Sequence, residues 1–168
     1  MVTMKKQILI GEESFEKIRE DNFFYIDKTM FIKEFLENRG TVTLITRPRR
    51  FGKTLNMSML RYFFDANMDS KAMFDGLKIM EHKDIVEKYQ NKYPVVFLTL
   101  KNVELPTYKS SIERIKSLVS AIYQQNMYLL ENGGLNEFQR KEFLGFCSKE
   151  TTEEELKDAL LNAGYIKP

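Results

Sequence analysis

The chain has 168 residues, of which 43% are hydrophobic and 30% are charged, and its formal net charge is +2. A chain this apolar is excluded from the low-hydrophobicity disordered class, and its length predicts one domain with at most a small appendage. One cysteine, Cys147, and one histidine, His82, exclude an internal disulfide and a zinc site of Cys and His ligands. Because we find neither a signal-peptide core nor a long apolar run, we expect a protein of a reducing compartment, most simply cytoplasmic, with no membrane partner.

The first part of the chain mixes helical and β-strand patterns. The run Val42 to Thr46 is β-branched, and the run 95–100 is apolar at nearly every position. Apolar residues at three-and-four spacing mark the helices. In chain order, the patterns predict a helix at 12–20, a weaker strand at 23–26, a helix at 29–38, a strand at 42–46, a helix at 54–65 and a strand at 95–100.

The last third of the chain is predicted to be helical throughout. The longest periodic segment covers 108–130 and is expected to end at Asn132-Gly133-Gly134, and a second helix is predicted at 135–147. Thr152 and Glu155 have the spacing of a capping box, which predicts a last helix at 152–163 with Gly164 after it. His82 is expected on the surface at a polar helix start.

Two apolar strands separated by helices are typical of a parallel sheet covered on both faces. We therefore predict an α/β fold with a three-layer arrangement like that of P-loop nucleoside triphosphatases, an incomplete parallel sheet and a helix-rich C-terminal part. Within one domain, residues 1–40 are expected to form a lead-in, residues 41–105 a βαβ core with the phosphate loop, and residues 106–168 a helical segment.

The most informative segment joins the strand at 42–46 to the helix at 54–65 and contains Gly52-Lys53-Thr54. Glycine lets backbone amides approach a phosphate closely, and the start of a helix presents N–H groups and the positive end of its dipole. Lys53 is expected to reach the β- and γ-phosphates, and Thr54 to coordinate Mg²⁺ through its hydroxyl. The predicted ligand is ATP with Mg²⁺, and the candidate nucleotide-binding residues are Arg49, Arg50, Phe51, Gly52, Lys53, Thr54 and Leu55.

Charge in this region leaves alternatives open. Residues 38–64 hold six basic residues and no acidic one, which attracts anions of any kind. Arg47 also stands where the usual phosphate-loop pattern has glycine. The same arginines suit a basic module that binds nucleic acid or a partner protein, and a surface turn or a remnant without function remains a further alternative.

Around these residues the sequence resembles the predicted AAA-ATPase-like family. The resemblance rests on Tyr25-Ile26-Asp27-Lys28-Thr29, on Thr46-Arg47-Pro48-Arg49-Arg50-Phe51-Gly52-Lys53-Thr54 and on the following residues to Leu60, and it covers at least residues 8–100. In that family the loop typically reads R-P-R-R-F-G-K-T, so Arg47 agrees with the family. The resemblance implies a P-loop nucleoside triphosphatase that binds ATP and Mg²⁺. Members are often followed by a nuclease-like domain, which implies DNA as an indirect partner through a domain this chain does not contain.

Hydrolysis needs a carboxylate that follows a second buried strand, and this sequence offers none in that place. Lys101 follows the run 95–100, and Asp27 precedes the loop, where it is more simply a cap for the helix at 29–38. We therefore expect an N-terminal piece of an ATPase domain, with little or no hydrolysis alone. An adenine-stacking role for Tyr25 has no support from spacing.

Overall fold

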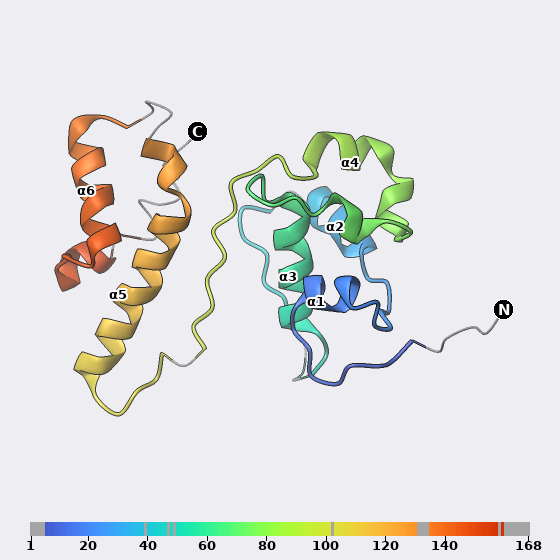
Figure 1. The fold of residues 1–168 in the computed structure, drawn as a ribbon, viewed down its shortest axis with the longest axis horizontal. Coiled ribbons are helices and arrows are strands. Elements are labelled where there is room, and N and C mark those ends of the chain that lie inside the picture. The colour runs from blue at the N-terminus through green and yellow to red at the C-terminus, as the bar shows by residue number, and fades with distance from the viewer. Residues whose placement is uncertain are drawn as a thin grey trace. The chain divides into compact units, whose positions relative to one another are not determined.

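The fold is taken from a computed structural model that describes residues 6–38, 40–46, 48, 50–101, 103–130, 135–157 and 159. The chain divides into two compact units, Met1–Val95 and Val96–Pro168, which are described separately. Figure 1 shows the elements in chain order. The helices of the first unit are α1 (Phe15–Glu20), α2 (Met30–Glu37), α3 (Lys53–Phe64), the 3-10 helices η1 (Lys71–Phe74) and η2 (Lys78–Glu81), and α4 (Lys83–Tyr89). Those of the second are α5 (Tyr108–Gln125), η3 (Met127–Leu130) and α6 (Glu137–Ser148).

The prediction of an α/β fold with a parallel sheet is wrong. The described residues contain no β-strand, and what pairing there is consists of an isolated parallel bridge between Asp65 and Tyr93. Residues 42–46 and 95–100 run without regular structure, and Val42 and Leu44 are 85% and 82% exposed. An apolar strand is buried only when neighbouring strands accept its backbone groups and helices cover its faces. Neither condition is met here, so the side chains of Val42 and Leu44 stay at the surface.

The core of the first unit forms where α3 meets α1 and the 3-10 helices. Phe15 of α1, Phe63 of α3 and Phe74 of η1 are each fully buried, and the ring centroid of Phe74 lies 4.9 Å from that of Phe15 and 5.3 Å from that of Phe63. The Phe15 backbone N–H donates to the hydroxyl of Ser58 at 3.1 Å. The apolar face predicted for residues 54–65 is therefore the side of α3 that packs into this core.

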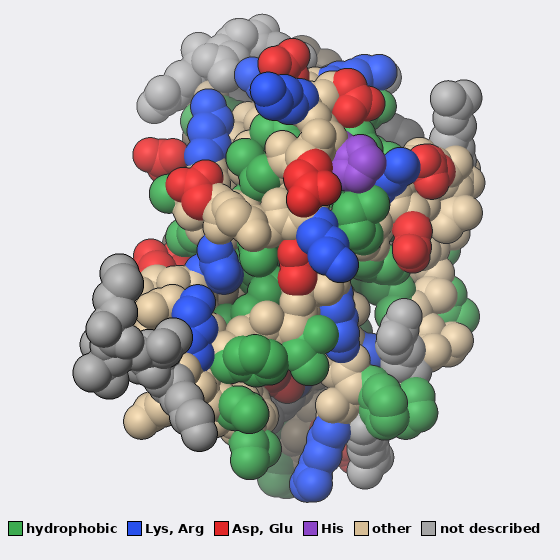
Figure 2. Space-filling model, turned by 90° about the vertical axis from the view of Figure 1, so that its right-hand side faces the viewer, with side chains coloured by type: hydrophobic (Ala, Val, Ile, Leu, Met, Phe, Trp, Pro, Cys, Tyr) green, Lys and Arg blue, Asp and Glu red, His purple; other side chains and the backbone are tan. Residues whose placement is uncertain are grey.

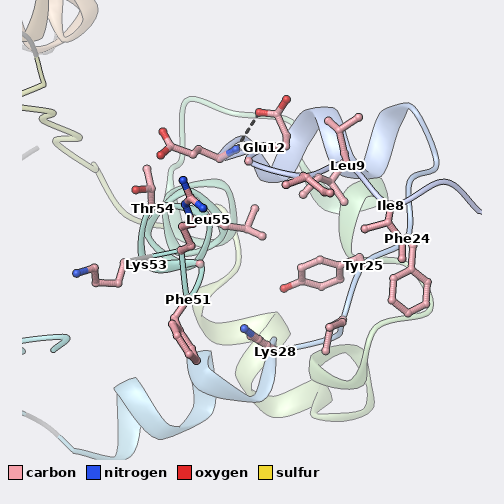
Figure 3. A pocket seen from close by; sticks show the side chains of 17 residues that line it. Ile8, Leu9, Glu12, Phe24, Tyr25, Lys28, Phe51, Lys53, Thr54 and Leu55 are labelled. Atoms are coloured by element: carbon pink, nitrogen blue, oxygen red, sulfur yellow. Dashed lines mark hydrogen bonds between the residues drawn. The ribbon is translucent and has the colours of Figure 1, made fainter. Parts of the chain in front are cut away.

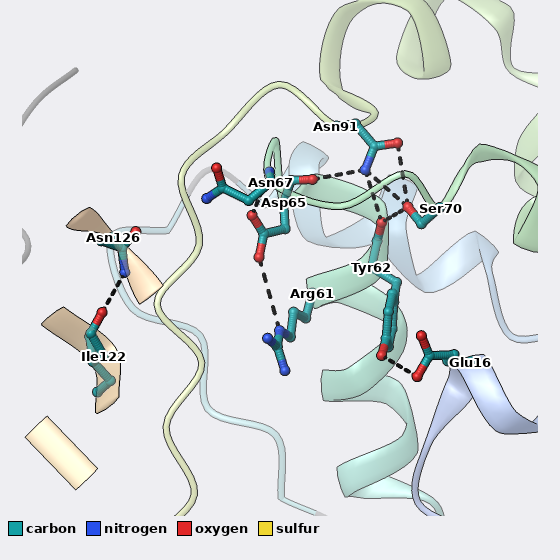
Figure 4. A network of polar contacts seen from close by, with 9 residues as sticks. All are labelled: Glu16, Arg61, Tyr62, Asp65, Asn67, Ser70, Asn91, Ile122 and Asn126. Carbon is teal, nitrogen blue, oxygen red and sulfur yellow. Dashed lines mark hydrogen bonds and ion pairs between the residues drawn. The ribbon is translucent and has the colours of Figure 1, made fainter. Parts of the chain in front are cut away.

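The C-terminal end of α3 is held by a network around Asn91 (Figure 4). The Asn91 side-chain amide donates to the backbone oxygen of Asp65 at 2.8 Å and to the hydroxyl of Ser70 at 2.9 Å. The backbone N–H groups of Asn91 and Tyr93 donate to the carbonyls of Phe63 and Phe64 at 2.8 and 2.9 Å. Carbonyls at a helix end have no partner inside the helix, so residues 91–93 satisfy them and fix this end of α3.

The second unit is a pair of helices, α5 and α6, which lie side by side (Figure 1). Tyr123 of α5 packs against Phe143 and Phe146 of α6, and its ring centroid lies 4.9 Å from that of Phe143 and 4.6 Å from that of Phe146. The Tyr123 hydroxyl donates to the carbonyl of Ala159 at 2.7 Å. Desolvation by burial raises the pKa of Tyr123 above its ordinary value, so the phenol stays neutral.

The predicted helices agree with the structure within a few residues. α1, α2, α3, α5 and α6 fall inside or close to the predicted ranges, although residues 127–130 form the separate turn η3. The predicted capping box is confirmed, because Thr152 N–H and Glu155 N–H each donate to the other residue's side chain, at 2.7 and 3.2 Å. The expected helix ends at 132–134 and 164 lie outside the described residues.

Two further expectations from the sequence concern His82 and membrane-crossing helices. His82 precedes α4 and lies at the surface (Figure 2), where the sequence places it. No helix in the described part of the chain combines the length and the hydrophobicity needed to cross a bilayer.

Candidate phosphate-binding site

The candidate site begins with the turn that leads into α3. Gly52 occupies the N-cap position with φ 72°, a left-handed conformation that strains any residue with a Cβ. Arg50 is also left-handed, with φ 68°, which is uncommon for a non-glycine residue and is found mainly in tight turns and functional sites. The first intrahelical hydrogen bond runs from Asn56 N–H to the Gly52 carbonyl at 2.9 Å. Gly52 has no side chain to cap the backbone N–H groups of the first turn of α3, so an external anion can take that position.

Most of the predicted nucleotide-binding residues come together around one pocket. Arg50, Phe51, Gly52, Lys53, Thr54 and Leu55 all line it, whereas Arg49 lies outside the described residues. Figure 3 shows that they differ in direction: the ammonium of Lys53 points away from the middle of the pocket, while Leu55 faces inward. Phe51 is 57% exposed at the rim.

The pocket extends from this turn to the N-terminal segment and has a volume of about 790 Å³. Its other walls come from residues 8–13, Ile18, residues 24–26 and Lys28, and they are mostly apolar. Figure 2 shows hydrophobic side chains gathered on the lower part of one face of the molecule. Tyr25 projects into the pocket (Figure 3), and its hydroxyl contacts the sulfur of Met59 at 3.4 Å. Burial raises the pKa of Tyr25 to about 12, so it offers a neutral ring and a hydroxyl donor.

Carboxylates of the site are engaged by neighbouring groups. Glu12 lines the pocket and forms an ion pair with Lys17, its Oε2 lying 3.1 Å from Nζ. Its other oxygen accepts the backbone N–H groups of Glu13 and Ser14 at 2.9 Å each. The hydrogen bonds from Ser14 and Lys17 lower the pKa of Glu12, so it is ionised at neutral pH and its charge is directed at Lys17.

Asp27, weighed above as a magnesium carboxylate, has a different place. Its Oδ1 accepts the backbone N–H and the hydroxyl of Thr29 at 2.9 and 2.6 Å, and its Oδ2 accepts the Lys78 N–H at 2.8 Å. The carboxylate therefore braces the entry to α2 against η2, and it accepts the N–H of the N-cap residue Thr29 rather than one inside α2. Among the described residues, no group of three or more His, Cys, Asp or Glu side chains is arranged to hold a metal ion. Cys147 lies in α6, where burial raises its thiol pKa, the opposite of what an activated nucleophile needs.

The sequence motif missed the rest of the pocket. Residues 8–10, which form one of its walls, have no motif of their own, and Lys28 carried no assigned role. The signal that pointed to Lys28 was its place in Tyr25-Ile26-Asp27-Lys28-Thr29, one of the stretches on which the family resemblance rests.

Comparison with known proteins identifies the family. The sequence model of the family described as Predicted AAA-ATPase matches residues 9–163. The chain belongs to this AAA-ATPase-like family. A curated relative, described as an uncharacterized protein in the vnfD 5' region of Azotobacter chroococcum mcd 1, is 37% identical over 93 residues. That match covers 55% of this chain and 16% of the relative, so the chain spans a small part of that relative's length. No solved structure matches the chain.

The match to the family model agrees with the resemblance that rests on the loop residues. It extends from the pocket wall at residue 9 through α3 and most of the second unit. The turn before α3 and all of the pocket lining except Ile8 thus lie inside the matched region.

Proposed function

We propose that this chain binds the phosphate groups of ATP, together with Mg²⁺, at the turn formed by residues 50–55. The observation that carries the proposal is the left-handed Gly52 at the start of α3, directly followed by Lys53 and Thr54 at the edge of a pocket. A residue without a Cβ permits close approach to the amides of the first turn, and the helix dipole favours an anion there. Membership in a family of predicted ATPases supports a nucleoside triphosphate as that anion.

The residues of the first turn fit the roles that such a ligand requires. Lys53 is exposed and has a long, flexible side chain, so its ammonium can rotate toward the terminal phosphates. Thr54 is half-buried and offers a hydroxyl oxygen, the ligand type that Mg²⁺ prefers. Because Mg²⁺ usually keeps several waters and binds the substrate's phosphates, one protein hydroxyl is compatible with this site. The bound ion would neutralise phosphate charge, and Thr54 would orient it.

The proposal is tested by ligand-dependent thermal stabilisation. ATP with Mg²⁺, added at about one hundred times its dissociation constant, should raise the free energy of unfolding by about 2.7 kcal/mol. Lys53→Ala should abolish most of this gain. Lys83→Ala is a matched control, because Lys83 is also exposed and is also the first residue of a helix, α4, but does not line the pocket.

Two results would count against this function. One is a wild-type protein that ATP does not stabilise, with or without Mg²⁺. The other is equal stabilisation in the Lys53 and Lys83 variants. Salt-sensitive binding of DNA without any effect of nucleotide would instead support the basic binding module.

A further inference from the structure

A further cation reaches the phosphate turn from a distant part of the sequence. Lys28 precedes α2 and lines the same pocket as Gly52 and Lys53. A Cβ placed on Gly52 would lie 3.8 Å from the Lys28 ammonium nitrogen. Figure 3 shows the Lys28 side chain rising toward the turn, between Phe51 and Tyr25. The open side of Gly52 therefore faces an ammonium group that is 24 positions away in the chain.

The backbone that carries Lys28 is braced on both sides. Asp27 accepts three hydrogen bonds, from the backbone N–H and hydroxyl of Thr29 and from the Lys78 N–H. Thr29 is fully buried, and its hydroxyl accepts the Ile79 N–H at 3.2 Å. The Lys28 carbonyl accepts the N–H of Phe31 at 3.0 Å. Little freedom is left for the backbone of Lys28, so its side chain emerges at a fixed point beside the turn.

The surroundings favour an anionic partner for Lys28. In the part of the chain that the structure describes, no carboxylate forms an ion pair with it. Glu12, which also lines the pocket, is occupied by Lys17 and by two backbone N–H groups. Lys28 is half-buried as a residue, and its ammonium lies beside a glycine that has no Cβ to shield it. In such partly desolvated surroundings an ammonium is stabilised by a phosphate oxygen.

We propose that Lys28 is a further phosphate-binding residue, from outside the turn, and that it contacts a phosphate close to the nucleoside, one that ADP and ATP share. The inference rests on the proposed function and deepens it. Lys28 lies on the side of Gly52 that faces the apolar walls at residues 8–10 and 24–26, whereas Lys53 points away from them (Figure 3). Those walls can hold a nucleoside, so the phosphates nearest to it lie nearest to Lys28. Lys53 then serves the terminal end of the chain of phosphates.

Calorimetric titration with ATP, ADP and inorganic pyrophosphate, each with Mg²⁺, tests the assignment. The variant is Lys28→Gln, which keeps most of the aliphatic stem and removes the charge. The matched control is Lys33→Gln, because Lys33 lies in α2 and does not line the pocket. Loss of one charge-assisted hydrogen bond should weaken binding of all three ligands by about tenfold or more. The factor should be equal for ADP and ATP, and Lys28→Arg should restore most of the affinity.

The outcomes separate this inference from the function on which it rests. If Lys53→Ala abolishes ATP binding while Lys28→Gln binds as tightly as wild type, the role of Lys28 is wrong and the proposed function stands. A loss confined to ATP would place Lys28 at the terminal phosphate and overturn the assignment. A loss for both nucleotides with pyrophosphate unaffected would show that Lys28 acts on the nucleoside. If the wild-type protein binds none of the three ligands, both proposals fail. Circular dichroism establishes that each variant is folded.

Discussion

Replacement of Gly52 by alanine separates backbone strain from phosphate approach. Gly52 has φ 72°, and the nearest atom to an added Cβ is the Lys28 ammonium nitrogen at 3.8 Å, an ordinary contact. No side chain or backbone atom must move, so the cost to stability is conformational, about 1–2 kcal/mol for an L-residue in the left-handed region. The new methyl group would nevertheless occupy the open side of the turn, where a phosphate must approach.

Gly76→Ala is the matched control for this strain. Gly76 has φ 75°, nothing lies within 4 Å of an added Cβ, and it does not line the pocket. Urea denaturation should therefore give both variants a similar loss of stability, about 1–2 kcal/mol. Calorimetric titration with ATP should distinguish them. Loss of one or two phosphate contacts, about 3 kcal/mol, should weaken binding roughly a hundredfold in Gly52→Ala alone. Equal ATP affinities in the two variants would refute the argument that a bare backbone is needed at this turn.

Two further predictions concern the braces around the site. Asn91→Gly should destabilise the first unit by about 2 kcal/mol, because the side-chain hydrogen bonds to the Asp65 carbonyl and to Ser70 are lost. Asn91→Ala should cost about 1 kcal/mol more than Asn91→Gly, because Asn91 has φ 53° and this left-handed conformation strains alanine but not glycine. Urea denaturation measures both, and equal stabilities of the two variants would contradict the strain argument. Burial alone would raise the pKa of Asp27, but hydrogen bonds from Thr29 and Lys78 lower this pKa below its ordinary value of 3.8. The ionised carboxylate therefore stabilises the fold above pH 3.8, and this stabilisation is lost as the pH falls through the pKa of the folded state. The difference in unfolding free energy between wild type and Asp27→Asn should therefore shrink from pH 7 to pH 3, and a constant difference would show that the charge of Asp27 is not involved.

The helices could be predicted because their signals are local. The side chains of Thr152 and Glu155 hydrogen-bond to each other's backbone as their spacing indicates. In α3, the apolar residues Met59, Leu60 and Phe63 are buried. Helical hydrogen bonds close within four residues, so periodicity and caps are enough to place them. The short turns η1 and η2 were not predicted, because each spans four residues and has too few apolar positions to show a period.

The prediction of strands was wrong because a strand depends on contacts that are not local. An extended segment needs partners from elsewhere in the chain, and the apolar character of residues 42–46 and 95–100 says nothing about whether partners exist. In the structure, Val42 and Leu44 are exposed and the described residues form no sheet. The candidate site shows the same division. Gly52, Lys53 and Thr54 are adjacent in sequence and were found by their motif, whereas Lys28 and the wall at residues 8–10 reach the pocket only through the packing of α1, α2 and α3.

The position of α3 explains how a turn can be presented to a ligand without loss of the fold. Its middle is buried at Met59 and Leu60, and its C-terminal carbonyls are held by residues 91–93. Its 12 residues span about 18 Å, so the end held by Asn91 and the end that begins at Lys53 have separate neighbours. Changes at sites this far apart, without shared partners, usually act independently. The strained backbone of Arg50 and the open N–H groups after Gly52 therefore adjoin a helix whose stability is secured elsewhere, which leaves the N-terminal turn able to match a phosphate group.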